Sequence, residues 1–363
     1  MAQNTPSESH PTHLSPSELG TKEYWETFYS RTLTHISTKH GRDETAQPPT
    51  TQEDKDEQSD YDDDASADGD SDPGTSWFSE HNAPAKVLAF LTEESFPLAP
   101  VNTLPPSPSP ISSSTDTGCK RRGRKKGAPL DPEAKHSQPT ILDLGTGNGS
   151  MLALLRKRGG FAGDMVGVDY SGKSVELARE LQDRRGHEAY QTDPEDEDES
   201  DFEEENENEQ DDDGAESVDE WDPILFSEWD ILSPSTPSDL QNKAVSWFPY
   251  DKGGFDIVLD KGTFDAVSLM AEKSETERYP GIAGGLVRRG GFLVVTSCNW
   301  TEEEVVRWFT GARLVGVDAK AEDEGENSNG NGKLVVWGRV QYPRFRFGGQ
   351  EGQGVCTVCF QRV

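Results

Sequence analysis

From residue 140 onward, short apolar runs alternate with segments in which apolar residues recur every three or four positions, a pattern typical of strands alternating with amphipathic helices. Strands are expected at 140–144, 164–170, 223–232, 253–262, 290–299, 333–342 and 354–363. Helices are expected after the first strand to about residue 158, at 171–186, before the fifth strand, and at 301–310. The repeated strand–helix units predict an α/β fold with a doubly wound, mostly parallel seven-stranded sheet. The last two strands have no helix between them, so we expect an antiparallel hairpin at one edge.

The first 139 residues hold two further amphipathic segments within stretches of low sequence complexity. Residues 17–36 predict a helix, because Ser17 can cap it and its aromatic and aliphatic residues recur at helical spacing. Residues 76–91 predict a second helix. We expect residues 1–16 to form a disordered tail and residues 17–363 to form a single domain. Disordered insertions are expected in that domain at about 41–75, 103–138, 192–220 and 320–332.

The negative charge of the chain is concentrated in two of these insertions. The formal net charge is −33. Asp193–Glu220 holds 18 acidic residues without Lys or Arg, and Asp43–Asp72 holds 13 against a single Lys, so the two tracts contribute −18 and −12, or −30 together. Acidic tracts with few apolar residues stay solvated. The net charge therefore says little about the partner of the folded core, although contact of these tracts with basic proteins is an alternative interpretation.

The lack of a membrane span or signal peptide in the sequence, together with the low cysteine content, favours a cytoplasmic protein. The chain has no run of 18 apolar residues and no signal-peptide pattern at its start, so we expect no membrane partner. The four cysteines are too few and too scattered for a disulfide scaffold. Cys356 and Cys359 form a CxxC, but they lack a second ligand pair and lie in an expected strand, so no metal is expected. The basic run at 120–126 has the composition of a nuclear import signal or a nucleic-acid patch, which leaves a nuclear location open. Nothing in the pattern indicates more than a monomer.

Three glycines spaced two residues apart, Gly145, Gly147 and Gly149, join the first strand to its helix. Such a turn lets a ligand approach backbone amides at the positive end of a helix. A dinucleotide-binding turn would carry another glycine where this chain has Ser150. S-adenosylmethionine fits better, because it has no phosphate and its ammonium group needs a carboxylate or carbonyl partner, which Asp143 or its neighbouring backbone can supply.

Carboxylates also lie at the ends of the next three strands, where open α/β sheets bind ligands. Asp169 can accept hydrogen bonds from both ribose hydroxyls, and Trp229 and Asp230 can flank the adenine ring. Asp260 ends the fourth strand. The expected cofactor-binding residues are Asp143, Gly145, Thr146, Gly147, Asn148, Gly149, Asp169, Tyr170, Trp229 and Asp230.

The motifs LGTKEYWETFY, LDLGTGNG, GVDYS, VLDKGTFDAVSL, TSCNWTEEE and FRFGGQEG together resemble one eukaryotic family of class I, seven-strand methyltransferases. That family methylates a lysine of translation elongation factor 1-alpha. The resemblance runs from residue 18 to the end, DKGTFDA and TSCNWT are its specific parts, and the long inserts between motifs are similar to those of fungal members. It implies a Rossmann-like fold, S-adenosylmethionine as the methyl donor and elongation factor 1-alpha as the protein substrate. It also implies that the segments of Trp25 and Trp77 cover the cofactor, and that Asp260 and the loop after it lie at the reaction centre.

Methylation of a lysine requires its neutral amine. Because the pKa of lysine is near 10.4, deprotonation at pH 7 costs about 4.6 kcal/mol, and an apolar channel lowers that cost. Trp77, Phe264 and Trp300 are candidate walls of this channel, and Lys261 is a further candidate for substrate binding. Asp260 is the candidate catalytic residue, since its carboxylate can accept a hydrogen bond from the incoming amine.

Two other classes of function stay open on the sequence. One is a methyltransferase that acts on another protein, a small molecule or RNA. The Asn/Asp-Pro-Pro-Tyr/Phe loop used for planar nitrogens is replaced by DKGT, and the core has no basic stripe, so we expect no nucleic-acid partner. The other is a non-catalytic acidic binding protein on a methyltransferase scaffold, against which the intact glycine loop argues.

Overall fold

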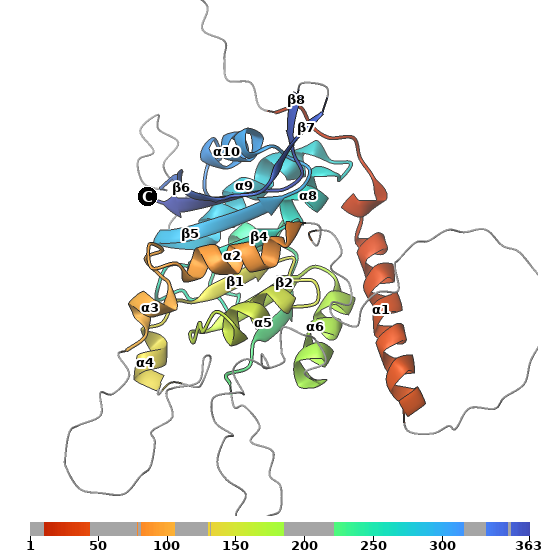
Figure 1. The fold of residues 1–363 in the computed structure, drawn as a ribbon, viewed down its shortest axis with the longest axis vertical. Helices are drawn as coiled ribbons and strands as arrows, with labels where there is room; N and C mark the ends of the chain where they lie inside the picture. The colour runs from red at the N-terminus through yellow and green to blue at the C-terminus, as the bar shows by residue number, and fades with distance from the viewer. Residues whose placement is uncertain are drawn as a thin grey trace, which may run out of the picture.

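A seven-stranded sheet lies between two layers of helices (Figure 1). The computed structural model describes residues 11–43, 78, 81–105, 130, 132–184, 221–315, 332–347 and 350–363. The strands of the sheet are β1 (Ile141–Leu144), β2 (Met165–Asp169), β3 (Leu225–Glu228), β4 (Phe255–Lys261), β5 (Val287–Ser297), β6 (Leu334–Val340) and β9 (Cys356–Arg362). They lie in the order β3-β2-β1-β4-β5-β9-β6.

The pairing confirms the expected doubly wound, mostly parallel sheet with an antiparallel edge. Strands β3, β2, β1, β4 and β5 pair in parallel, whereas β9 is antiparallel to both β5 and β6. The C-terminal strand is therefore inserted between β5 and the edge strand β6. Cys356 and Cys359 both lie in β9 and are buried, as expected for strand residues.

Helices cover both faces of the sheet, and strand residues that alternate in direction supply a core to each. One layer holds α1 (Lys22–Asp43), α2 (Ala83–Thr92), α5 (Ser150–Lys157) and α6 (Gly172–Arg184). The other holds α7 (Thr236–Gln241), α8 (Thr263–Ser268), α9 (Lys273–Leu286) and α10 (Glu302–Thr310). Ile141 packs in the first core, and its neighbour Leu142 packs in the second.

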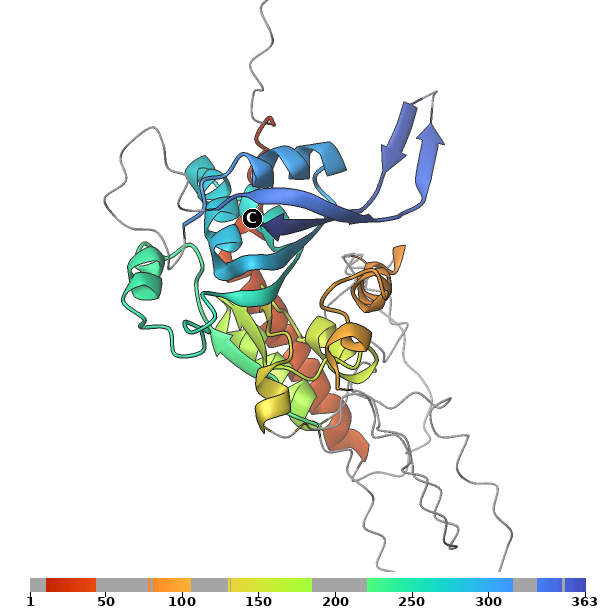
Figure 2. The same cartoon turned by 90° about the vertical axis from the view of Figure 1, so that its left-hand side faces the viewer.

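Several shorter elements complete the described chain. They are the 3₁₀ turn η1 (Glu18–Gly20), α3 (Pro100–Thr103), α4 (Pro132–His136), β7 (Arg344–Phe347) and β8 (Gln350–Gln353). Strands β7 and β8 form a separate antiparallel hairpin, which the sequence did not predict and which projects from the body of the protein (Figure 2).

Helix boundaries depart from the sequence prediction at three places. The helix expected at 76–91 begins only at Ala83, because Pro84 suits a first helical turn and lacks the amide that a preceding turn would use. Helix α1, expected at 17–36, begins only at Lys22, because Ser17 precedes the turn η1 and makes no side-chain cap bond, and it continues to Asp43, into the start of the insertion expected at 41–75. Helix α4 lies within the insertion expected at 103–138. Most of the remainder of these two insertions lies outside the described residues. Trp77 also lies outside them.

The N-terminal segment crosses the carboxyl edge of the sheet and contacts both helix layers. Helix α1 lies beside α6 (Figure 1), where the Glu26 carboxylate accepts a 2.9 Å hydrogen bond from the Gly172 amide. Before α1, the Ser17 amide donates to the Leu269 carbonyl at 3.0 Å. A Cβ atom on Gly20 would lie 2.4 Å from the Leu269 carbonyl carbon, so only glycine permits this approach.

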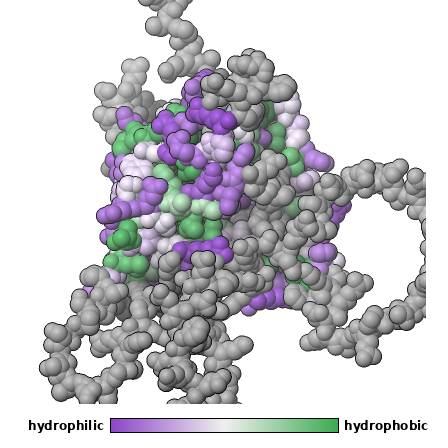
Figure 3. Space-filling view, viewed as in Figure 1, coloured by the Kyte–Doolittle hydropathy of each residue, from purple (hydrophilic) through white to green (hydrophobic). Residues whose placement is uncertain are grey.

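The described surface intermingles hydrophilic and hydrophobic residues on the face shown in Figure 3. Val101, Leu225 and Val363 are the most exposed large hydrophobic residues among those described. Within the same ranges, none of the helices combines the length and the apolar character needed to cross a bilayer.

Candidate cofactor and active site

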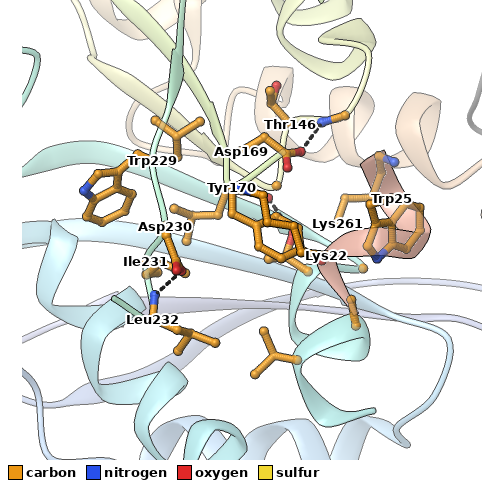
Figure 4. A pocket seen from close by; sticks show the side chains of 18 of the residues that line it. Lys22, Trp25, Thr146, Asp169, Tyr170, Trp229, Asp230, Ile231, Leu232 and Lys261 are labelled. Atoms are coloured by element: carbon orange, nitrogen blue, oxygen red, sulfur yellow. Dashed lines mark hydrogen bonds between the residues drawn. The ribbon is translucent and has the colours of Figure 1, made fainter. Parts of the chain in front are cut away.

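A cavity of about 330 Å³ opens at the carboxyl ends of β1, β2 and β4 (Figure 4). This volume is in the range of small-molecule sites. Eight of the residues proposed from the sequence line it, namely Gly145, Thr146, Gly147, Asp169, Tyr170, Trp229, Asp230 and Lys261. The structure therefore brings residues from four strand ends to one cavity, as the strand-end argument requires.

The glycine loop forms one wall of the cavity and depends on its glycines. Gly145 and Gly147 have φ values of 60° and 59°, a region that side chains disfavour. A Cβ atom on Gly145 would lie 2.2 Å from Thr263 Oγ1, and one on Gly147 would lie 3.1 Å from the Tyr29 hydroxyl oxygen. At the end of the loop, Gly149 caps α5 and the Asn148 side chain accepts from the Ser150 amide at 3.1 Å. The loop is thus packed from both sides and keeps its backbone close to the cavity.

Asp169 ends β2 at the cavity and is held by three donors. One oxygen accepts from the Gly147 amide at 3.1 Å and from the Ser174 hydroxyl at 2.8 Å, and the other accepts from the Ser171 amide at 2.9 Å. Burial raises the pKa of this carboxyl. Because two carboxylate oxygens have about four acceptor sites, this position still allows a bond to a ribose hydroxyl.

Asp143 lies behind the glycine loop and is not among the residues that line the cavity. It is buried, and one oxygen accepts a 2.9 Å hydrogen bond from Thr146 Oγ1, a residue that does line the cavity. Burial raises the pKa of Asp143 to about 6. Its direct contact with the ammonium group stays a prediction, and the structure connects it to the cavity through Thr146.

The segment after β3 forms the end of the cavity assigned to adenine. The Trp229 ring packs edge-on against Trp247, with ring centroids 5.2 Å apart and an angle of 87°. Asp230 accepts from the Leu232 amide at 2.9 Å, a bond that shapes the turn. Figure 4 shows Trp229 and Trp25 on opposite sides of the cavity with Tyr170 between them.

Asp260 is buried below the cavity and does not line it. One oxygen accepts from the amides of Thr263 and Phe264 at 3.0 and 3.1 Å, and the other accepts from the Tyr279 hydroxyl at 2.8 Å. Burial raises the pKa of Asp260 to about 7. The carboxylate thus holds the start of α8, and with it the loop 261–263 that does line the cavity.

The aromatic candidates for a channel wall occupy different places. Phe264 and Trp300 are buried in the core beside α9 and α10, stacked at 6.0 Å, and do not line the cavity. Phe78, which the sequence reasoning missed, does line it. Its ring lies 5.2 Å from Lys261 Nζ and would contact a Cβ atom on Gly262 at 2.9 Å.

The N-terminal segment covers the cavity through Gly20, Lys22, Trp25 and Tyr29. The Trp25 indole donates to the Leu19 carbonyl at 2.8 Å, and its ring stacks on Tyr29 at 5.9 Å. Lys22 and Tyr29 also were missed from the sequence. Two signals were available. Lys22 and Tyr29 lie in the motif LGTKEYWETFY, whose segment the resemblance expected to cover the cofactor, and Trp25 and Tyr29 are spaced four residues apart, on one face of an expected helix.

The residues present fit S-adenosylmethionine. The glycine loop offers a cradle that side chains would fill, a carboxylate at the end of β2 faces the cavity, and an aromatic ring and a second carboxylate follow β3. When bound, S-adenosylmethionine supplies an electrophilic methyl group on a sulfonium.

Comparisons with known proteins point the same way. Residues 135–212 match the family model described as a methyltransferase domain. The chain is 26% identical to protein-lysine N-methyltransferase EFM4 of Saccharomyces cerevisiae over 352 residues, or 96% of each chain. It is 28% identical to EEF1A lysine methyltransferase 2 of Danio rerio over 61% of this chain and 66% of that one.

Among solved structures, the magnesium protoporphyrin IX methyltransferase of Synechocystis PCC 6803 with bound SAM matches with a TM-score of 0.33. The two are 11% identical over 62% of this chain and 70% of that one. The fold assignment rests on the strand order described above. With that strand order and the glycine-loop cavity, the sequence matches identify the chain as a class I, S-adenosylmethionine-dependent methyltransferase that is similar to these fungal and vertebrate protein-lysine methyltransferases.

Proposed function

We propose that this protein transfers methyl groups from S-adenosylmethionine to a lysine ε-amine of translation elongation factor 1-alpha. The observation that carries the proposal is the similarity to EFM4 along 96% of both chains, combined with a cavity built by the residues that the family motifs single out. The vertebrate relatives are named as EEF1A lysine methyltransferases, which supports the same protein substrate.

The cavity lining next to the loop 261–263 supports an amine as the acceptor. Phe78, Ala266, Val267 and Met270 line this region, and all four are apolar. An apolar surface disfavours the ammonium form of lysine and so reduces the cost of presenting the neutral amine. Phe78 is therefore our proposed wall of the acceptor channel, in a segment that also contains Trp77.

Asp260 is proposed to act through the loop that it holds. Its carboxylate bonds to the amides of Thr263 and Phe264, and Thr263 Oγ1 in turn donates to the Leu144 carbonyl at 2.6 Å. These bonds fix the loop after β4 against the end of β1. In this arrangement Asp260 positions the cavity wall, and the alignment of donor and acceptor is what the enzyme contributes to the displacement. Phe264 and Trp300 support that wall from the core.

The test uses purified protein, tritiated S-adenosylmethionine and recombinant, unmodified elongation factor 1-alpha, followed by mass spectrometry of the labelled band. We expect label on a lysine of the factor and none when that lysine is replaced by arginine. If the protein binds S-adenosylhomocysteine but leaves the factor unlabelled, the proposed substrate is refuted, whereas the assignment as a methyltransferase is not. Labelling of a whole lysate would then identify the acceptor.

A further inference from the structure

Two cationic side chains, Lys22 and Lys261, line the described cavity. The cofactor carries an α-carboxylate as well as an ammonium group, and a carboxylate that enters a largely enclosed site needs a cation or several amides as its partner. Which lysine supplies that partner depends on how the cofactor lies across the strand ends.

The proposed contacts order the cofactor along the sheet. Adenine would lie beside Asp230 after β3, and the ribose would lie beside Asp169 at the end of β2. Since β1 and β4 follow β2 in the sheet, the methionine part extends toward the ends of β1 and β4. Lys261 is the last residue of β4, and Asp260 before it pairs with Leu144 at the end of β1.

Local contacts place Lys261 beside the glycine loop. Thr263, two residues later, packs on Gly145, and the Lys261 charge lowers the pKa of Asp143 against the larger effect of burial. Its Nζ lies over the Phe78 ring, and within the described part of the chain Lys261 makes no ion pair. An ammonium that is held only by an aromatic face is available to a carboxylate.

Lys22 already has two partners beside the ends of β2 and β3. Its Nζ lies 3.4 Å from the Glu228 carboxylate at the end of β3 and 5.8 Å from the centre of the Tyr170 ring. Both partners belong to the strand ends assigned to adenine and ribose. Lys22 therefore already has an anionic partner there.

We propose that Lys261 binds the α-carboxylate of the methionine part of S-adenosylmethionine. This inference rests on the proposed orientation of the cofactor, and it assigns Lys261 to the methyl donor where the sequence interpretation assigned it to the protein substrate. If Lys261 binds this carboxylate, the Phe78 ring, over which Lys261 Nζ lies, would face the acceptor side of the cavity.

The experiment measures binding by calorimetry for the full chain and for Lys261→Gln, Lys261→Arg and Lys22→Gln. The ligands are S-adenosylhomocysteine, which has the carboxylate, and decarboxylated S-adenosylhomocysteine, which retains the ammonium and lacks only the carboxylate. We expect Lys261→Gln to weaken S-adenosylhomocysteine by about 10- to 100-fold, since a hydrogen bond between charged groups is lost. Binding of the decarboxylated ligand should stay within about twofold, which also shows that the variant is folded.

Two matched variants sharpen the result. Lys261→Arg should retain most of the affinity for S-adenosylhomocysteine, and Lys22→Gln should not distinguish the two ligands. The proposal is overturned if Lys261→Gln weakens both ligands equally, or if it weakens neither. None of these measurements involves elongation factor 1-alpha, so a failure of the proposed substrate would leave their outcome unchanged.

Discussion

The hydroxyl oxygen of Tyr29 lies 3.1 Å from the point that a Cβ atom on Gly147 would occupy. Helix α1 and the glycine loop thus meet directly over the cavity, although they are far apart in the sequence. The helix that covers the cavity is part of the packed fold, because Tyr29 and Leu33 of α1 are buried in the same core as α5 and α6.

Gly147→Ala should weaken the binding of S-adenosylhomocysteine by at least about tenfold, which corresponds to about 1.4 kcal/mol. The added methyl group meets Tyr29, and the left-handed backbone costs roughly 1–2 kcal/mol of stability. Gly253→Ala is the matched control, because Gly253 has a φ of 72° but nothing within 4 Å of its Cβ position. The control should lose stability without losing affinity. Equal affinities in the two variants would show that the glycine loop does not bind the cofactor.

Asp260→Asn should gain stability relative to the wild type as the pH rises from 5 to 8. Burial raises the pKa of Asp260 to about 7 from an unfolded value near 4. Between about pH 4 and pH 7 the folded state therefore binds more protons than the unfolded state. The free energy of unfolding of the wild type therefore falls as pH rises through this window, by up to about 1.4 kcal/mol per pH unit. Asparagine keeps an oxygen for the amides of Thr263 and Phe264 and has no charge to desolvate.

The measurement is thermal unfolding of both proteins at pH 5, 6.5 and 8 without ligand. The difference in Tm between the variant and the wild type should grow with pH and level off near pH 7. A difference that stays constant would mean that the carboxylate of Asp260 is already ionised at pH 5. Affinity for S-adenosylhomocysteine, measured in parallel, should change little, because Asp260 does not line the cavity.

Phe78→Leu should lower kcat/KM for the protein substrate by about tenfold and leave the affinity for S-adenosylhomocysteine within about threefold. The physical reason is that Phe78 forms the apolar wall next to the loop after β4, on the side assigned to the acceptor amine. Phe90→Leu is the control, since Phe90 packs against the same small core cluster but does not line the cavity. If both variants behave alike, Phe78 contributes only to packing.

Deletion of residues 193–220 should leave the affinity for S-adenosylhomocysteine and the Tm unchanged within error. The described segments on either side of this insertion are joined, because the Gln182 side chain donates to the Ile224 carbonyl at 3.1 Å and accepts from its amide at 2.9 Å. Shortening a loop whose ends are already joined changes its closure entropy only slightly. A loss of cofactor binding on deletion would show that the acidic tract takes part in the site.

The sequence predicted the carboxyl edge of the sheet well because its signal is local. Asp169 follows an apolar run, so its place at a strand end could be read from five neighbouring residues. Gly145 and Gly147 likewise lie between a strand and a helix whose periods differ. Where the backbone conformation depends on one short segment, the residue types in that segment are sufficient to predict it.

Side-chain direction was harder to predict. The resemblance implied that Asp260 lies at the reaction centre, but its carboxylate accepts hydrogen bonds from three donors below the cavity. Phe264 was expected in a channel wall and is instead surrounded by the rings of Tyr279, Trp300, Trp308 and Phe309. Which side of a turn faces the ligand depends on helices that pack there later in the chain.

By itself the sequence determined the alternating α/β organisation, the glycine loop, the cofactor class and the carboxylates at successive strand ends, since each depends on residues adjacent in the chain. Only the tertiary structure decided that β9 lies between β5 and β6, that Tyr29 of α1 packs against the glycine loop, and that Lys22 pairs with Glu228 whereas Lys261 lies over Phe78. These relationships join segments far apart in sequence. They are fixed by the packing of apolar faces on both sides of the sheet, which no local pattern encodes.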